Sequence, residues 1–125
     1  MRFVYAVAFE GDKFLMVRNR RRGWEMPGGK IGSGESPQEA VEREFLEETG
    51  MKFESFASSD LPNGAVFFGW VKKGGGEPAP RDATNSEEID SISLFDILPE
   101  ELSFPRKEYE SMLQEARIEL KKHRR

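Results

Sequence analysis

The chain has 125 residues, with 19 Lys and Arg, 23 Asp and Glu, one His and no Cys, and its formal net charge is −4. Apolar residues make up 37% and charged residues 34%, which excludes a disordered chain and predicts one globular domain over residues 1–125. The absence of Cys excludes a disulfide scaffold, a cysteine nucleophile and thiolate zinc sites, and it suits a reducing compartment.

The first predicted element is an apolar run over residues 2–9, which a turn at residues 10–12 joins to a second run at 13–18. The first run is too short for a signal peptide, and no segment of the chain reaches membrane-spanning length. We therefore expect a cytoplasmic protein with no membrane contact. A basic loop follows at residues 18–22, then a short strand at 24–27 that Gly28 and Gly29 should stop.

A helix is predicted over residues 37–49. Ser36 is a suitable N-cap, Pro37 fits the first helical position, and Glu39 completes a capping box with Ser36. Gly50 supplies the C-terminal stop.

The remaining elements are strands at 52–58, 64–73 and 89–95, and a final helix from Pro105 to about His123. The glycine- and proline-rich stretch at 74–80 is expected to be a loop. Strands and helices that do not alternate regularly favour the α+β class with a mixed sheet.

The whole negative charge excess lies in residues 29–51, which hold six of the 23 acidic residues and two of the 19 basic ones. On a helical wheel, Glu44, Glu47 and Glu48 share an arc of about 100° beside the core-facing Val41 and Phe45. Glu39 and Glu42 point away and are expected in solvent. Three clustered carboxylates indicate either a divalent-cation site or an ordinary solvated helix face.

The residues around this helix follow the pattern Gly29-x5-Glu35-x7-Arg43-Glu44-Phe45-x-Glu47-Glu48-x-Gly50-Met51. This pattern resembles the signature of the Nudix hydrolase family, with all seven fixed identities present. Phe45 and Met51 stand at positions that the family fills with bulky aliphatic residues. The segment from Trp24 to Ile31 is similar to the MutT-like branch.

The resemblance implies an α/β/α sandwich around a mixed sheet, and Mg²⁺-dependent hydrolysis of a nucleoside diphosphate linked to another group. Mn²⁺ is the expected substitute metal. Carried over by position, Glu44, Glu47 and Glu48 are the metal ligands, and Arg43 orients the glutamates. Glu44 is also a candidate base, and the Gly29 carbonyl is a further candidate ligand. Glu35 is expected to hold the loop before the helix.

The family often takes one more acid from a distant loop. Asp82, Glu87 and Glu88 are the candidates here, and Glu88 is preferred because it enters a strand. The candidate substrate contacts are Arg18, Lys30 and Phe67. Phe67, Phe68 and Trp70 could stack on a nucleobase, and packing in the core is the alternative for all three.

The expected substrate is a nucleoside triphosphate, including an oxidised dGTP. The expected products are the nucleoside monophosphate and pyrophosphate. ADP-ribose or another nucleoside diphosphate derivative is the alternative substrate. A non-catalytic module of the same fold, which senses a nucleotide or binds a partner, is the alternative function. We expect a monomer or homodimer with no nucleic-acid partner, because the chain is acidic and its basic clusters are short.

Overall fold

The computed structural model describes residues 2–72 and 87–124. The elements in chain order are β1 (Phe3–Glu10), β2 (Lys13–Asn19), β3 (Gly23–Glu25), β4 (Gly28–Lys30), α1 (Pro37–Thr49), β5 (Lys52–Leu61), β6 (Gly64–Lys72), β7 (Ile89–Phe95) and α2 (Arg106–His123). Within these described ranges the strands form one seven-stranded mixed sheet. The predicted α+β class is confirmed.

The order of the sheet is β3-β2-β1-β6-β5, with β4 added to β1 and β7 to β2. β1 and β6 run parallel over seven residue pairs, and the other pairs are antiparallel. One edge of β1 is shared: its first residues pair with β4, and its last two pair with β2. The sheet therefore splits between β2 and β4, and the chain from β3 to β4 crosses that split.

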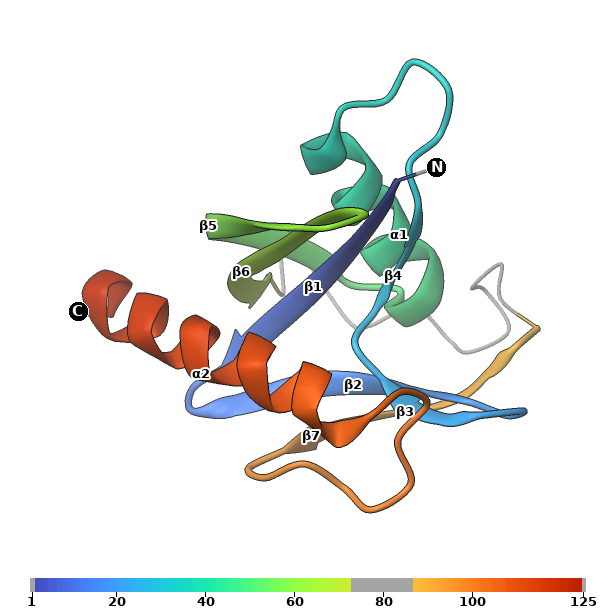
Figure 1. Ribbon diagram of the computed structural model, residues 1–125, viewed down its shortest axis with the longest axis vertical. Coiled ribbons are helices and arrows are strands. Elements are labelled where there is room, and N and C mark those ends of the chain that lie inside the picture. Colours follow the sequence, from blue (N-terminus) through green and yellow to red (C-terminus); the bar gives the residue numbers. More distant parts are fainter. Residues whose placement is uncertain (1, 73–86, 125) are drawn as a thin grey trace.

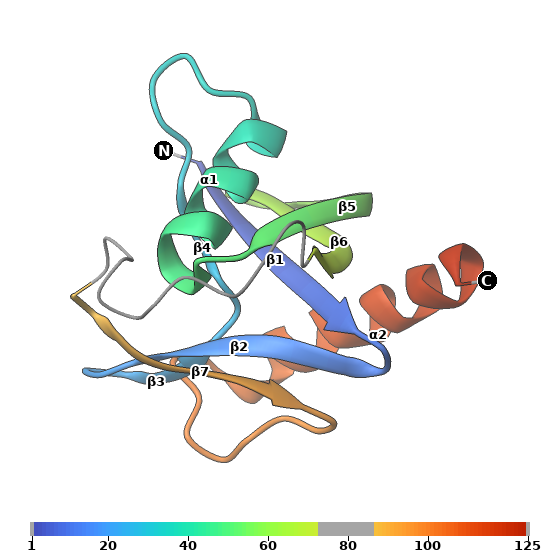
Figure 2. The same ribbon diagram turned by 180° about the vertical axis from the view of Figure 1, so that it is seen from behind.

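The two helices cover opposite faces of the sheet. In Figure 1, α2 crosses in front of β1, whereas Figure 2, seen from behind, has α1 in front. Two separate core clusters correspond to these faces, one including Ala40, Val41 and Phe45 of α1 and the other the buried residues of α2. The α/β/α arrangement that the resemblance implied is present.

Side-chain alternation along β1 explains why its apolar run is continuous. Val4, Ala6 and Ala8 pack on the α1 side, while Val7 and Phe9 pack on the α2 side. A strand covered on both faces has no polar positions to leave in solvent.

The helix over residues 37–49 is confirmed with its capping box. The Glu39 N–H donates to Ser36 Oγ at 3.1 Å, and the Ser36 N–H donates to Glu39 Oε1 at 2.9 Å. Gly50 ends the helix with a φ of 76°, in the left-handed region.

Two local predictions were wrong. Gly28 and Gly29 do not simply stop a strand at 24–27, because they begin β4 and pair with Tyr5 and Val4 of β1. The predicted basic loop also begins later than expected, since Arg18 and Asn19 belong to β2. Both errors arise from long-range strand pairing, which local sequence does not encode.

Residues 74–80 and Asp82 lie outside the described ranges. Among the described helices, none is long and apolar enough to cross a membrane.

Candidate active site

Two cavities have Gly28 and Gly29 of β4 in their walls. The smaller, of about 540 Å³, is acidic and is lined by Gly28, Gly29, Glu44, Glu47, Glu48, Glu87 and Glu88. The larger, of about 950 Å³, lies between the sheet and α2 and shares both glycines.

Close approach of backbone requires glycine at position 28, whereas a side chain at position 29 would displace the Glu44 carboxylate. A Cβ on Gly28 would overlap the Val4 carbonyl oxygen, and one on Gly29 would overlap the Glu44 carboxylate. Because β4 has no side chains here, the carboxylates of α1 lie directly against its backbone. The Gly28 N–H donates to Glu48 Oε1 at 3.1 Å.

Arg43 is the cationic centre of the acidic cluster. Its guanidinium donates to Glu35 Oε1 at 2.9 Å, to Glu47 Oε1 at 3.2 Å and to the Lys30 carbonyl oxygen at 3.1 Å. It also lies 3.3 Å from Glu44 Oε2. The planar fork of arginine suits several carboxylates at once, so Arg43 constrains where Glu44 and Glu47 lie.

Glu35 joins the loop before α1 to this centre. Its Oε1 accepts from the Gly32 N–H at 2.7 Å as well as from Arg43. Hydrogen bonds from Arg43 and then from Gly32 lower the pKa of Glu35 to about 2. These contacts match the structural role expected for Glu35.

Glu48 and Glu44 are carboxylates in an unfavourable environment. Burial, with the nearby charges of Glu44 and Glu25, raises the pKa of Glu48 to about 8 despite the Gly28 hydrogen bond. Burial also raises the pKa of Glu44. A bound cation would remove this cost, because it stabilises the ionised form of both groups.

The donor set of the smaller cavity fits a hard divalent cation. Glu44, Glu47 and Glu48 supply oxygen ligands, which Mg²⁺ and Mn²⁺ prefer, and Gly29 permits close backbone approach. As they stand, however, no three acidic or histidine side chains in residues 2–72 and 87–124 are grouped closely enough to hold a metal ion. Glu47 is hydrogen-bonded to Arg43 and Glu48 to Gly28, so these side chains must turn to share an ion.

Of the three candidate distant acids, Glu87 and Glu88 line the acidic cavity, and Asp82 lies outside the described residues. Asn19 Nδ2 lies 3.5 Å from Glu88 Oε2, and the Arg20 N–H donates to the Glu88 carbonyl at 2.8 Å. These contacts tie the entrance of β7 to the end of β2.

The three candidate substrate contacts lie elsewhere among the described residues. Arg18 donates to Asp90 Oδ2 at 2.9 Å, and Phe67 is 7% exposed in the core cluster beneath α1. Lys30 is exposed at the end of β4. None of the three lines either of the two cavities.

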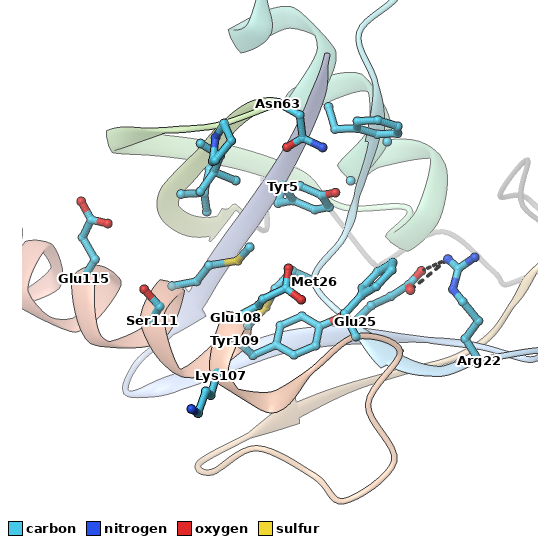
Figure 3. A pocket seen from close by; sticks show the side chains of 18 residues that line it. Tyr5, Arg22, Glu25, Met26, Asn63, Lys107, Glu108, Tyr109, Ser111 and Glu115 are labelled. Atoms are coloured by element: carbon cyan, nitrogen blue, oxygen red, sulfur yellow. Dashed lines mark hydrogen bonds and ion pairs between the residues drawn. The ribbon is translucent and has the colours of Figure 1, made fainter. Parts of the chain in front are cut away.

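The larger cavity is also lined by residues that were not among the predicted site residues. Arg22 and Glu25 form an ion pair in its lining, and Tyr5 reaches into the same space from β1 (Figure 3). Tyr109 extends from α2 toward Glu25 (Figure 3). Tyr109 also belongs to the core cluster on the α2 side, and helical periodicity does not distinguish a core aromatic from one that also borders a cavity.

Comparison with known proteins places this site in a family. The model of the NUDIX domain matches residues 2–114, which is most of the chain. This chain belongs to the Nudix family. The resemblance inferred from residues 29–51 is thereby confirmed, and we propose this segment as the Nudix box.

Curated relatives match only part of the chain. The Nudix hydrolase YvcI of Bacillus subtilis is 54% identical over 41 residues, which cover 32% of this chain and 26% of YvcI. YtkD of the same organism, provisionally named an 8-oxo-dGTP diphosphatase, is 40% identical over 52 residues, covering 42% of this chain and 33% of YtkD. The matches thus span a quarter to a third of these relatives.

Solved Nudix structures share the whole fold. The Bacillus subtilis pyrophosphohydrolase BsRppH is 25% identical with a TM-score of 0.67, and the alignment covers 97% of this chain and 81% of BsRppH. The shared architecture extends well beyond the Nudix box, and it includes the strands and α2 that enclose the larger cavity.

Proposed function

We propose that this Nudix protein is a hydrolase that cleaves the pyrophosphate link of a nucleoside diphosphate derivative, with Mg²⁺ as cofactor. The leading substrate class is a nucleoside triphosphate, hydrolysed to the monophosphate and pyrophosphate. The proposal draws on the diphosphatase and pyrophosphohydrolase names of YtkD and BsRppH, and on the family of the chain.

The single observation that carries this proposal is that an acidic cavity and a largely apolar cavity both have Gly28 and Gly29 in their walls. A nucleotide has a flat, largely apolar base at one end and anionic phosphates at the other. The larger cavity has the apolar walls that suit a base, and the acidic cavity suits phosphates whose charge a metal ion neutralises. The scissile link would then lie beside the two glycines.

Glu44, Glu47 and Glu48 are the proposed metal ligands, with the Gly29 carbonyl and Glu88 as further candidates. Bound Mg²⁺ would shield the phosphate oxygens and lower the pKa of a bound water. Arg43 keeps Glu44 and Glu47 in place through the contacts described above. Glu44 is the candidate base that takes a proton of the attacking water. The water oxygen would form a new bond to phosphorus as the bond from phosphorus to the leaving phosphate oxygen breaks.

The test is a hydrolysis assay with Mg²⁺ and a panel of nucleoside triphosphates, oxidised deoxynucleoside triphosphates, ADP-ribose, NADH and dinucleoside polyphosphates. Phosphate and pyrophosphate are measured separately. We expect nucleoside triphosphates to be the best substrates, with pyrophosphate as product. Glu48→Gln should lower kcat by about 100-fold, because one metal ligand is lost.

Glu42→Gln is the matched control, since Glu42 lies on the same helix, carries the same charge and is exposed. Unchanged turnover in Glu48→Gln would contradict the metal assignment. ADP-ribose as the best substrate would overturn the triphosphate assignment, and no turnover of any compound would favour the nucleotide-sensing alternative.

A further inference from the structure

The carboxylate of Glu25 lines the larger cavity, and the Glu25 side chain is 12% exposed. Arg22 Nη2 donates to both carboxylate oxygens, at 3.1 and 3.0 Å (Figure 3). The Arg22 guanidinium also lies 5.4 Å from the ring centre of Phe104, which limits its movement. Because Arg22 Nη2 lies between the two carboxylate oxygens, each oxygen keeps its outer lone pair for a ligand N–H.

A second observation concerns the Tyr109 hydroxyl. Tyr109 is 3% exposed, and its hydroxyl oxygen is buried with no hydrogen-bond partner among the described residues. Buried hydroxyl groups nearly always have a partner. Burial and then the charge of Glu25 raise the pKa of Tyr109, so the hydroxyl keeps its proton. An unpartnered hydroxyl at the wall of a cavity points to a polar group that a ligand supplies.

The walls of this cavity decide which ligand group fits. Glu108 adds a second carboxylate, and burial together with Glu108 and Glu25 raises the pKa of Tyr5. Glu115 is a third carboxylate in the lining, and Lys107 and Arg22 are its two cations, so the negative charges outnumber the positive ones and disfavour phosphate. Most other wall residues are apolar: Phe3, Met26, Leu61, Pro62, Val66, Phe104 and Met112. The cavity therefore suits a flat apolar ring that presents N–H donors to fixed acceptors.

We propose that Glu25 is a specificity-determining residue, and that it selects a nucleobase with adjacent imino and amino N–H groups, as in guanine. Arg22 is a positioning residue that holds the carboxylate, and the Tyr109 hydroxyl supplies a further contact to the base. Uracil and thymine place an acceptor on each side of their single imino N–H, and adenine places an acceptor beside its amino group. Each would direct a lone pair at the carboxylate, which is unfavourable. This inference rests on the proposed function, because it assigns the base end of the same site.

The test compares GTP with inosine triphosphate, which lacks only the 2-amino group. For the wild-type protein with Mg²⁺, we expect kcat/KM for GTP to exceed that for inosine triphosphate by at least about tenfold. In Glu25→Gln the ratio should fall to within about threefold, because an acceptor is replaced by a donor. Glu110→Gln is the matched control, since Glu110 is exposed on α2 and does not line the cavity. It should keep the wild-type ratio.

If the Arg22–Glu25 pair had a purely structural role, Glu25→Gln would change kcat/KM for GTP and for inosine triphosphate by the same factor. The ratio is measured within one preparation, so partial misfolding of a variant does not alter it. Equal use of GTP and inosine triphosphate by the wild type, or an unchanged ratio in Glu25→Gln, would overturn the proposal.

Binding of GMP and IMP, measured by calorimetry, separates this proposal from the hydrolase assignment. If no nucleotide is hydrolysed, the proposed function fails, while a Glu25-dependent preference for GMP over IMP would still support the role of Glu25. Equal affinities for GMP and IMP would reject that role.

Discussion

At the scale of single residues, the site depends on close contact between a strand without side chains and a helix rich in carboxylates. Gly29 leaves room for Glu44, and the Gly28 N–H is bonded to Glu48. Arg43 is the cation that contacts both Glu44 and Glu47. The positions of these carboxylates thus follow from a few neighbouring groups rather than from general surface charge.

The raised pKa of Glu48 makes stability depend on pH in metal-free buffer. The folded protein holds this proton up to about pH 8, whereas the unfolded chain releases it near the ordinary value of 4.5. Between these values the folded state binds more protons, so the free energy of unfolding should fall as pH rises from 5 to 8. The fall should be on the order of 4 kcal/mol or less.

Urea unfolding at several pH values checks this prediction. Glu48→Gln should remove most of the pH dependence, and Glu42→Gln, at an exposed position on α1, should not. The same slope in wild type and Glu48→Gln would show that other groups are responsible.

The residue-level predictions from sequence succeeded where the helix alone decides them. Glu44, Glu47 and Glu48 lie together at the edge of the packed face, and Glu39 and Glu42 are exposed, as the wheel required. Glu25 was missed because its role depends on Arg22, Tyr109 and the cavity between them. No local pattern reports those contacts.

At the scale of elements, α1 is bounded by local signals that the structure confirms. The reciprocal hydrogen bonds of Ser36 and Glu39 begin it, and Gly50 ends it. The beginning of α1 sets the position of Arg43 two turns later, and with it the contact to Glu35 in the preceding loop.

Ser36→Ala should therefore destabilise the protein by about 1 kcal/mol, because the Glu39 N–H loses its acceptor. For a chain of this size the Tm should fall by about 4 °C. Thermal unfolding followed by circular dichroism measures the change. Ser33→Ala, in the exposed part of the preceding loop, should leave the Tm unchanged, and an equal fall in both variants would argue against the cap.

At the scale of the whole molecule, the split in the sheet creates the site. β1 pairs with β4 at its start and with β2 at its end, so the chain between β3 and β4 crosses the gap. This crossing places Glu25 toward α2 and Gly29 toward α1, and the two cavities form on either side.

Metal binding should stabilise the whole protein if the acidic cavity holds the ion. At a Mg²⁺ concentration of 100 times the Kd, the expected gain is about 2.7 kcal/mol, measurable by thermal or urea unfolding. The double variant Glu44→Gln/Glu48→Gln should show no such gain. Glu42→Gln/Glu110→Gln removes the same charge from exposed helix positions and should respond as wild type does. Equal stabilisation of both double variants would place the ion elsewhere.

The sequence by itself determined the helices, most strand positions, the α+β class, the Nudix family and the shared face of three glutamates. These features depend on spacing, capping and side-chain periodicity, which are local. The tertiary structure alone decided that β1 and β6 pair in parallel, that Gly28 and Gly29 form a strand, and that Glu25 and Tyr109 border one cavity. Such features depend on contacts between residues far apart in the chain, whose energies no local segment contains.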